Sequence, residues 1–432
     1  MIEILSIFLS LFTFILFSTF PINYFHYKKI FAVYKINFFD ILSINLILFL
    51  NLLLIFSFFS LDLRVIFLLY ILICILFFLF NFNKYILFFK KNKIIFFLFF
   101  LIVFCLSLTI AQISILTWDG AAHWLFKAQN FYQGSEYKNL VNLPMNHYPH
   151  LGSYVWAFFW KNSFLKLEYF GRFFFIFIFI VSIFSLGQQL NKNFSTLEKL
   201  FITFAITVFS TNIFLFGGYQ EYLIFFILFV FSRLFFLLLK NSQFSNFLTI
   251  LLLLLTANLL LWVKQEGFFY YIFLNLIFIF HLKNKFYYRF YYIIISVSFL
   301  LIFIFIKIHF FGSFRFNENV IHPNLFDNYN IIILFNKILM IAKYILISFF
   351  KYPIWLIIIF SSIILFFKYN FFSKFYFLYT FAFLSFLLIF LIYIQTKEDI
   401  SWLLPLTLNR LIFPISGFYA FLIVQLLNKF KH

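Results

Sequence analysis

The sequence predicts an all-α polytopic membrane protein with about thirteen transmembrane helices. Composition is the first observation: 65% of the 432 residues are hydrophobic and 10% are charged, with a mean hydropathy of +1.06. The second is that apolar runs of about 18 residues or more recur along the whole chain. The third is that these runs are continuous rather than alternating. This pattern excludes a β-barrel and favours long helices, which satisfy their own backbone groups in hydrocarbon.

The expected spans are apolar stretches bounded by charged or turn residues. No repeat, Gly/Ser linker or soluble segment interrupts them, so we treat residues 1–432 as one integral membrane domain. The first stretch lacks the basic region and cleavage site of a signal peptide, and we expect it to be a retained span. The predicted spans are 3–21, 40–60, 65–83, 94–114, 170–189, 200–216, 223–239, 245–263, 268–281, 291–308, 352–367, 376–394 and 409–427.

The basic residues predict which side of the membrane each loop faces. If the spans alternate, 18 of the 32 Lys and Arg residues fall on one face, and only 6 fall in the short loops of the other. By the positive-inside rule the first face is cytoplasmic. Of the 13 acidic residues, 11 fall on the outer face. The net charge of +19 is therefore mainly an orientation signal, so nucleic-acid binding is not needed to explain it.

Two longer segments are not simple spans. Residues 115–169 form the first large outer loop, whose second half is rich in Trp and Lys and suits an interfacial helix. Residues 309–351 form a second outer loop. Its end, 329–350, is also expected to be an interfacial helix, because Asn336, Lys337 and Lys343 interrupt an otherwise apolar sequence.

The stretch TWDGAAHWLFKAQNFYQG, residues 117–134, opens the first outer loop with polar groups at helical spacing. A helix that begins after Trp118 would place Asp119, His123 and Lys127 on one face through their i, i+4 and i+8 positions. The alternative is that Asp119 caps the helix and the rest is a solvated face. The same loop continues into NHYPHLGSY, and this further concentration of hydrogen-bonding groups favours a site; its members are His147, Tyr148 and His150.

Three other polar clusters lie at predicted outer ends of helices. The stretch FGGYQEYL places Glu221 at the start of a span, where helix capping is the alternative. LLLWVKQEGFFYY places Lys264 and Glu266 in a short turn between spans, where snorkelling of the lysine is the alternative. TKEDISWLLPLTLNRLIFP places Arg410 at the edge of the hydrocarbon, where a partner or an anionic ligand is expected. Because all four clusters open on one face, we expect them to form one site.

Such a site suits an amphiphile with an anionic headgroup and a tail in the bilayer. Carboxylates deprotonate or orient a hydroxyl, while Lys and Arg neutralise a phosphate. A sugar linked to a lipid phosphate fits this description. Its phosphate leaves without a strong proton donor, so the site mainly needs to position the acceptor and balance charge.

The motifs resemble those of the GT-C superfamily of polytopic glycosyltransferases, in a bacterial branch with W-D-x-x-x-x-W-x-x-K-A in the first outer loop. This sequence reads WDGAAHWLFKA from Trp118 to Ala128. It is also similar in YPHL (148–151), GYQE (218–221), KQEG (264–267) and an NR pair at 409–410. The matching segments cover about a tenth of the chain and stand in the family's order.

The resemblance implies a role for each site residue. Asp119 is the carboxylate that engages the acceptor, and Glu221 is a second catalytic acid. Lys264 and Arg410 bind the donor phosphate, with Glu266 holding Lys264 or the sugar. The remaining expected substrate-binding residues are Trp118, His123, Lys127, His147, Tyr148 and His150. No second carboxylate adjoins Asp119, so no metal or other cofactor is predicted, although some relatives use a divalent metal.

The resemblance also implies the partners and the location. We expect a polyprenyl-phosphate-sugar donor, a glycan, lipid or protein acceptor, contact with membrane lipid, and no nucleic acid. The protein would reside in a bacterial inner membrane with its site facing the periplasm or exterior. Two alternatives stay open. A polysaccharide polymerase or ligase would use His309, Arg315 and His322 in the second outer loop, whereas a lipid or sugar transporter would carry charges at mid-membrane.

Overall fold

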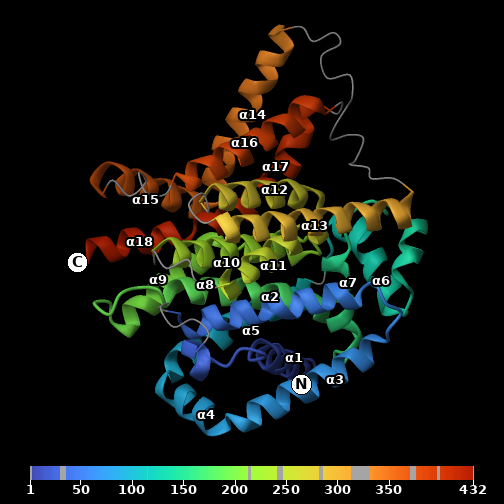
Figure 1. Cartoon of the computed structure of the whole chain (residues 1–432), viewed down its shortest axis with the longest axis vertical. Helices are drawn as coiled ribbons and strands as arrows, with labels where there is room; N and C mark the ends of the chain where they lie inside the picture. Colours follow the sequence, from blue (N-terminus) through green and yellow to red (C-terminus); the bar gives the residue numbers. More distant parts are fainter. Residues whose placement is uncertain are drawn as a thin grey trace.

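The computed structural model describes residues 2–29, 36–113, 115–212, 216–240, 247–281, 286–312, 331–369, 376–396 and 399–431. Within these ranges all regular structure is helical, so the predicted all-α class is confirmed. Figure 1 shows a bundle in which many of the helices run side by side, with α14 projecting from it. Arg315, His322 and Glu398 lie outside the described residues.

The helices follow the predicted spans closely but subdivide the loops. The first half contains α1 (Ile2–Ser18), η1 (Tyr24–Lys29), α2 (Phe38–Phe56), α3 (Leu63–Phe80), α4 (Phe82–Lys91), α5 (Lys93–Ile113), η2 (Gly120–Leu125), α6 (Phe126–Tyr132), η3 (Tyr137–Asn142), α7 (Leu151–Lys161), α8 (Tyr169–Gly187) and α9 (Thr196–Ser210). The second half contains α10 (Glu221–Lys240), α11 (Phe247–Val263), α12 (Gln265–His281), α13 (Phe286–Phe311), α14 (Ile331–Lys351), α15 (Pro353–Tyr369), α16 (Phe377–Gln395), α17 (Ile400–Tyr419) and α18 (Phe421–Phe430).

Among the described residues, seven helices are long and apolar enough to cross a membrane, or up to nine if each of two bent pairs is one span. The chain therefore has the helices of an integral membrane protein, but the predicted count of thirteen is not confirmed. Four predicted spans fall on helices α1, α9, α11 and α12, which have 15 to 17 residues. A helix of this length is shorter than the roughly 20 residues that usually span the hydrocarbon.

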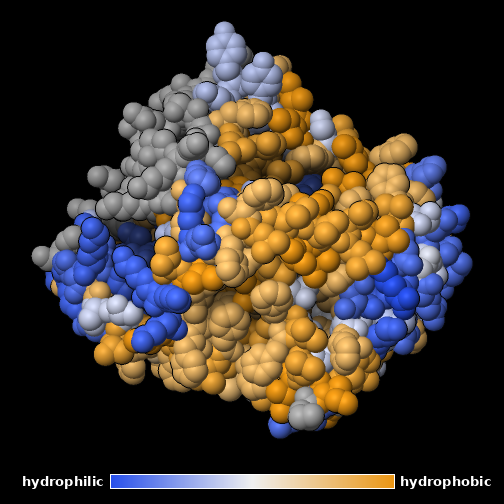
Figure 2. Space-filling model, turned by 90° about the horizontal axis from the view of Figure 1, so that it is seen from below, coloured by the Kyte–Doolittle hydropathy of each residue, from blue (hydrophilic) through white to orange (hydrophobic). Residues whose placement is uncertain are grey.

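The surface is divided into an apolar zone and two hydrophilic ends. Figure 2 shows a broad hydrophobic face with hydrophilic residues gathered at its two sides. At one end the last residues of the chain contact the start of α9, where Nζ of Lys431 lies 2.6 Å from Oε1 of Glu198. Helix α9 runs from this contact to Ser210, a length of about 22 Å. Just beyond it, the backbone N–H of Asn212 donates to the hydroxyl of Tyr222 at 2.8 Å, so the start of α10 lies at the opposite end of α9.

The centre of the bundle consists of α8 and α10, which are hydrophobic along most of their length and buried within the protein. Helix α17 packs closely against α10. A Cβ atom added to Gly417 would lie 2.5 Å from the carbonyl oxygen of Phe225, so the helices approach too closely for a larger residue. This contact fixes α17 against α10, the helix that begins with Glu221.

The structure adds detail to three predicted segments, of which only the last differs from its prediction. The expected interfacial helix at the end of the first loop is α7, whose residues 151–159 are buried against other helices. Helix α14 meets α15 at 99°, so the two do not form one straight span. Helix α17 begins at Ile400 rather than near 409, which places Arg410 ten residues, or about 15 Å, inside it. The depths of α7 and α14 relative to the headgroups stay predictions.

Asp40 and Arg233 lie within two of the predicted spans, 40–60 and 223–239. The structure buries both and pairs them between α2 and α10, with Nη2 of Arg233 2.8 Å from Oδ2 of Asp40. Ser185 donates a hydrogen bond to the other carboxylate oxygen, and the backbone N–H of Asn37 donates to Oδ2. The pair therefore joins helices inside the bundle.

Candidate functional site

Five of the predicted site residues form one chain of ion pairs. The Nη1 atom of Arg410 lies 2.5 Å from Oδ2 of Asp119, and its Nε atom lies 2.9 Å from Oε1 of Glu221. That same Oε1 atom lies 3.1 Å from Nζ of Lys264, which also lies 3.4 Å from Oε1 of Glu266. We call these five side chains the acid-rich network. It joins residues up to 291 positions apart in the sequence.

The loop that carries Asp119 packs directly onto the turn before α10. Thr117 donates to the carbonyl oxygen of Gly217 from its backbone N–H, at 2.9 Å, and from its hydroxyl, at 2.8 Å. A Cβ atom on Gly120 would lie 2.2 Å from that same oxygen, so only glycine fits. Gly218 has a φ of +98°, in the left-handed region that favours glycine. These glycines allow Asp119 to lie beside the start of α10.

A buried arginine also holds this turn. Arg172 on α8 donates from Nη1 to the carbonyl oxygen of Phe216 at 3.1 Å and pairs with Glu168, Nε to Oε1, at 2.9 Å. Burial raises the pKa of Glu168 more than Arg172 lowers it. The sequence analysis did not assign these two residues. The signal was available, since Arg172 lies within a predicted span, where a charge needs a partner.

Glu221 is the central carboxylate of the network. It is the first residue of α10, where the exposed N–H groups of the first turn favour a negative charge. Its side chain is fully buried, and both cations contact it through Oε1. Among the residues that the structure describes, no hydrogen-bond partner contacts its buried Oε2 atom, and the same holds for Oε2 of Glu266. A buried acceptor without a partner is unfavourable, so these oxygens favour a ligand that brings donors.

Lys264 occupies the break between α11 and α12. A Cβ atom on Gly267 would lie 2.1 Å from the carbonyl oxygen of Leu260, so the two helices meet too tightly for a larger residue. The ammonium is buried, which lowers the pKa of Lys264, but Glu221 and Glu266 outweigh this effect and raise the pKa above its usual value. Lys264 is therefore a charged, paired residue and does not snorkel to the surface.

Arg410 reaches the network from the interior of α17. Its guanidinium carbon lies 3.7 Å from the centre of the Tyr219 ring, a stacked cation–π contact. Nη1 and Nε of the guanidinium contact carboxylates. Tyr219 was not among the predicted site residues, although it lies inside the GYQE motif. Stacking holds the plane of the guanidinium and thereby orients its remaining donors.

The helix that opens the first loop keeps His123 near Asp119 but carries Lys127 to other partners. Residues 120–125 form the π-helical turn η2, in which more residues make up each turn than in an α-helix. His123 stays near Asp119, with Nε2 4.0 Å from Oδ1, and Trp118 packs against its ring. Burial lowers the pKa of His123 more than Asp119 raises it. Asp119 makes no capping hydrogen bond, so the capping alternative is not observed.

Lys127 points into a different cluster, where it supports the second part of the loop. Its fully buried ammonium donates to the carbonyl oxygens of Met145 and Tyr148 at 2.8 and 2.9 Å. Burial lowers its pKa well below the usual value, and the nearby Lys307 adds to this effect. Lys307 on α13 donates to the carbonyl oxygen of His147 at 3.2 Å. The two lysines thus hold residues 145–148 from two helices.

The remaining loop residues divide between the network and the interior. The ring of Tyr148 is stacked with that of His123 at 6.1 Å, so it lies near the network. The ring of His147 packs on Tyr148. His150 is fully buried, and its Nε2 atom lies 2.6 Å from Oγ of Ser57. Substrate binding by these residues stays a prediction, and for His150 the structure provides an interior partner instead.

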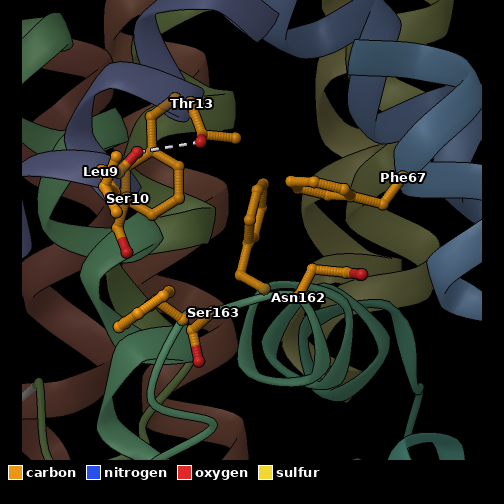
Figure 3. A pocket seen from close by; sticks show the side chains of 9 residues that line it. Leu9, Ser10, Thr13, Phe67, Asn162 and Ser163 are labelled. Atoms are coloured by element: carbon orange, nitrogen blue, oxygen red, sulfur yellow. Dashed lines mark hydrogen bonds between the residues drawn. The ribbon is translucent and has the colours of Figure 1, made fainter. Parts of the chain in front are cut away.

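A cavity of about 200 Å³ lies among α1, α3 and α7, and none of its lining residues belongs to the network. Figure 3 shows its polar side chains on the helices around it. These groups are satisfied locally, since the Thr13 hydroxyl donates to Leu9 and the Ser163 hydroxyl to Trp160. The cavity therefore adds no acidic or basic group to those of the network.

The described residues contain no group of three or more His, Cys, Asp or Glu side chains arranged to hold a metal ion. Asp399, at the fourth predicted cluster, caps α17 by accepting a hydrogen bond from the Ser401 backbone. Comparisons with protein-family models, with curated proteins and with solved structures found no match to this chain. Its function is therefore argued from the network itself.

Proposed function

We propose that the chain is a GT-C-type glycosyltransferase, which moves one sugar from a polyprenyl-phosphate donor to a hydroxyl acceptor at the outer face of the membrane. The acid-rich network carries this proposal. Four distant segments supply acids and bases at the end of the bundle opposite the pair formed by Lys431 and Glu198. A structural role alone would not explain why two buried carboxylate oxygens there lack partners.

The chemistry requires one proton acceptor and a stabilised leaving group. The acceptor oxygen attacks the anomeric carbon and forms the new C–O bond, with inversion at that carbon. The bond from this carbon to the phosphate oxygen breaks, and its electron pair stays on the phosphate. Asp119 takes the proton from the acceptor hydroxyl. Arg410 and Lys264 balance the charge on the departing phosphate.

Glu221 and Glu266 have supporting roles in this mechanism. Glu221 lies between both cations and fixes their separation from its rigid position at the start of α10. The two unpartnered oxygens accept hydrogen bonds from sugar hydroxyls. The sugar and the acceptor are chosen by contacts that the network alone does not define.

The test begins with a strain that lacks the protein. A polyprenyl-phosphate sugar should accumulate there while a surface glycan, lipid or protein loses that sugar. The accumulated donor is then supplied to the purified protein in lipid vesicles, and both sugar transfer and donor translocation are measured. Transfer without translocation supports the proposal. Translocation without transfer favours a transporter, and processive chain growth favours a polymerase.

A further inference from the structure

The charges of the acid-rich network are not balanced. It contains three carboxylates and two cations, and both Arg410 and Lys264 already contact two carboxylates each. With His123 neutral, because burial lowers its pKa, the formal charge of the network is −1. A phosphate that entered without any rearrangement would be placed among like charges in a poorly solvated site. Phosphate binding therefore requires that one carboxylate leave its cation.

Asp119 is the carboxylate best placed to leave. Its side chain is 24% exposed, whereas that of Glu221 is 0% exposed and contacts both cations. Among the described residues, Asp119 contacts one charged base, Arg410. It also lies at the start of a π-helical turn, while Glu221 begins a long buried helix. The cost of moving Asp119 is lower, because water can solvate the released carboxylate.

We propose that Asp119 occupies the phosphate position on Arg410 in the ligand-free site, and that the donor phosphate displaces it. This inference rests on the proposed function, since it assumes a lipid-phosphate donor. Arg410 remains stacked on Tyr219 and paired with Glu221 through Nε, so its orientation does not depend on Asp119. The Nη1 donor that Asp119 releases becomes available to a phosphate oxygen.

The exchange fixes the order of binding. While Asp119 is paired with Arg410, its Oδ2 atom accepts a hydrogen bond from the guanidinium and is not available to an incoming hydroxyl. Once phosphate has taken its place, the carboxylate is free to accept a proton. Donor binding therefore precedes productive acceptor binding, and a site without donor does not activate an alcohol or water.

Undecaprenyl phosphate binding to the purified full-length protein in detergent tests the exchange. Asp119→Asn keeps the size of the side chain but removes its charge, so the variant should bind undecaprenyl phosphate about tenfold more tightly than the wild type, or about 1.4 kcal/mol. Asp62→Asn is the matched control. It also removes one negative charge, but Asp62 pairs with Lys161 outside the network. Its affinity should equal that of the wild type.

The possible outcomes separate the inference from the proposed function. Wild-type binding with equal or weaker binding by Asp119→Asn overturns the exchange and leaves a lipid-phosphate donor standing. No saturable binding by either protein overturns both. An equal gain in Asp62→Asn also overturns the exchange, because the effect is then one of net charge. If Asp119→Asn does not elute as a single folded species, Asp119→Ser provides the same comparison.

Discussion

Two groups of buried charges lie on α10, and they differ in how completely each charge is paired. Towards the end of the helix, Arg233 contacts both oxygens of Asp40, and Ser185 and Asn37 donate to the same carboxylate. At the start of the helix, Glu221 shares one oxygen between two cations and leaves the other without a partner. The first group is one acid and one base, whereas the second has an extra acid.

This difference indicates different roles for the two groups. A buried pair is favourable only when its geometry is good and further hydrogen bonds satisfy the remaining atoms, as at Asp40. Unsatisfied oxygens and unbalanced charge lower stability, so they persist where a ligand supplies what is missing. The pair between Asp40 and Arg233 joins helices, whereas the acid-rich network is suited to bind a ligand.

The largest expected effect on stability comes from breaking the satisfied pair. Asp40→Asn leaves the buried guanidinium of Arg233 without its counter-charge and should lower the free energy of unfolding by about 3–5 kcal/mol. Glu266→Gln in the network should cost less than about 1 kcal/mol, because its carboxylate is partly exposed and one oxygen has no partner. Unfolding by denaturant in detergent measures both. Equal losses would remove the distinction between the two groups.

Lys127 offers a smaller effect, because its ammonium is held by backbone carbonyl oxygens. Lys127→Met removes the donor of the hydrogen bonds to Met145 and Tyr148, so it should cost about 1–3 kcal/mol. Burial lowers the pKa of Lys127 below its unfolded value of 10.5. Between these two pKa values the unfolded chain binds more protons, so wild-type stability should rise with pH.

The pH dependence of unfolding measures this contribution. The stability difference between wild type and Lys127→Met should increase as the pH rises towards 10.5, since the wild type alone gains from deprotonating this lysine. Lys199→Met is a matched control, because Lys199 also donates to a backbone carbonyl but is less buried. A difference that does not change with pH would show that Lys127 is charged in the folded protein.

A smaller effect than at Lys127 is expected at Asp399, which lies in the fourth polar cluster of the sequence. Its side chain accepts a hydrogen bond from the backbone of Ser401 at the start of α17. Asp399→Ala should therefore cost about 1 kcal/mol, the usual value of a helix cap. Thermal unfolding measures the loss, and sugar transfer should be unchanged. Reduced transfer by a stably folded variant would extend the site beyond the network.

The network residues could be predicted from the sequence, because a charged side chain at the end of an apolar span is energetically unfavourable unless it is paired or binds a ligand. It also placed Asp119, Glu221, Lys264 and Arg410 together from their common predicted face. It did not predict that Lys127 separates from Asp119, because only the folded loop brings the carbonyl oxygens of Met145 and Tyr148 to its ammonium. No residue pattern marks the π-helical turn of residues 120–125 either.

Other features of the structure could have been predicted from charged residues within the apolar spans. Arg233 and Lys307 lie inside predicted spans, and a charge there indicates a partner rather than a loop. The charge count that set the orientation instead treated both as loop charges, Arg233 on the cytoplasmic face and Lys307 on the outer face. The start of α17 at Ile400 was hidden because Pro405 and Pro414 suggest a break, yet the structure keeps both within the helix.

The most direct test of the account is sugar transfer by Asp119→Asn in lipid vesicles, with the polyprenyl-phosphate sugar isolated from the strain that lacks the protein. The account predicts that transfer falls by about 10²- to 10⁴-fold, as expected for loss of a general base, while the unfolding temperature stays that of the wild type. Transfer at a rate close to that of the wild type would contradict the assignment of the acid-rich network as the reaction site.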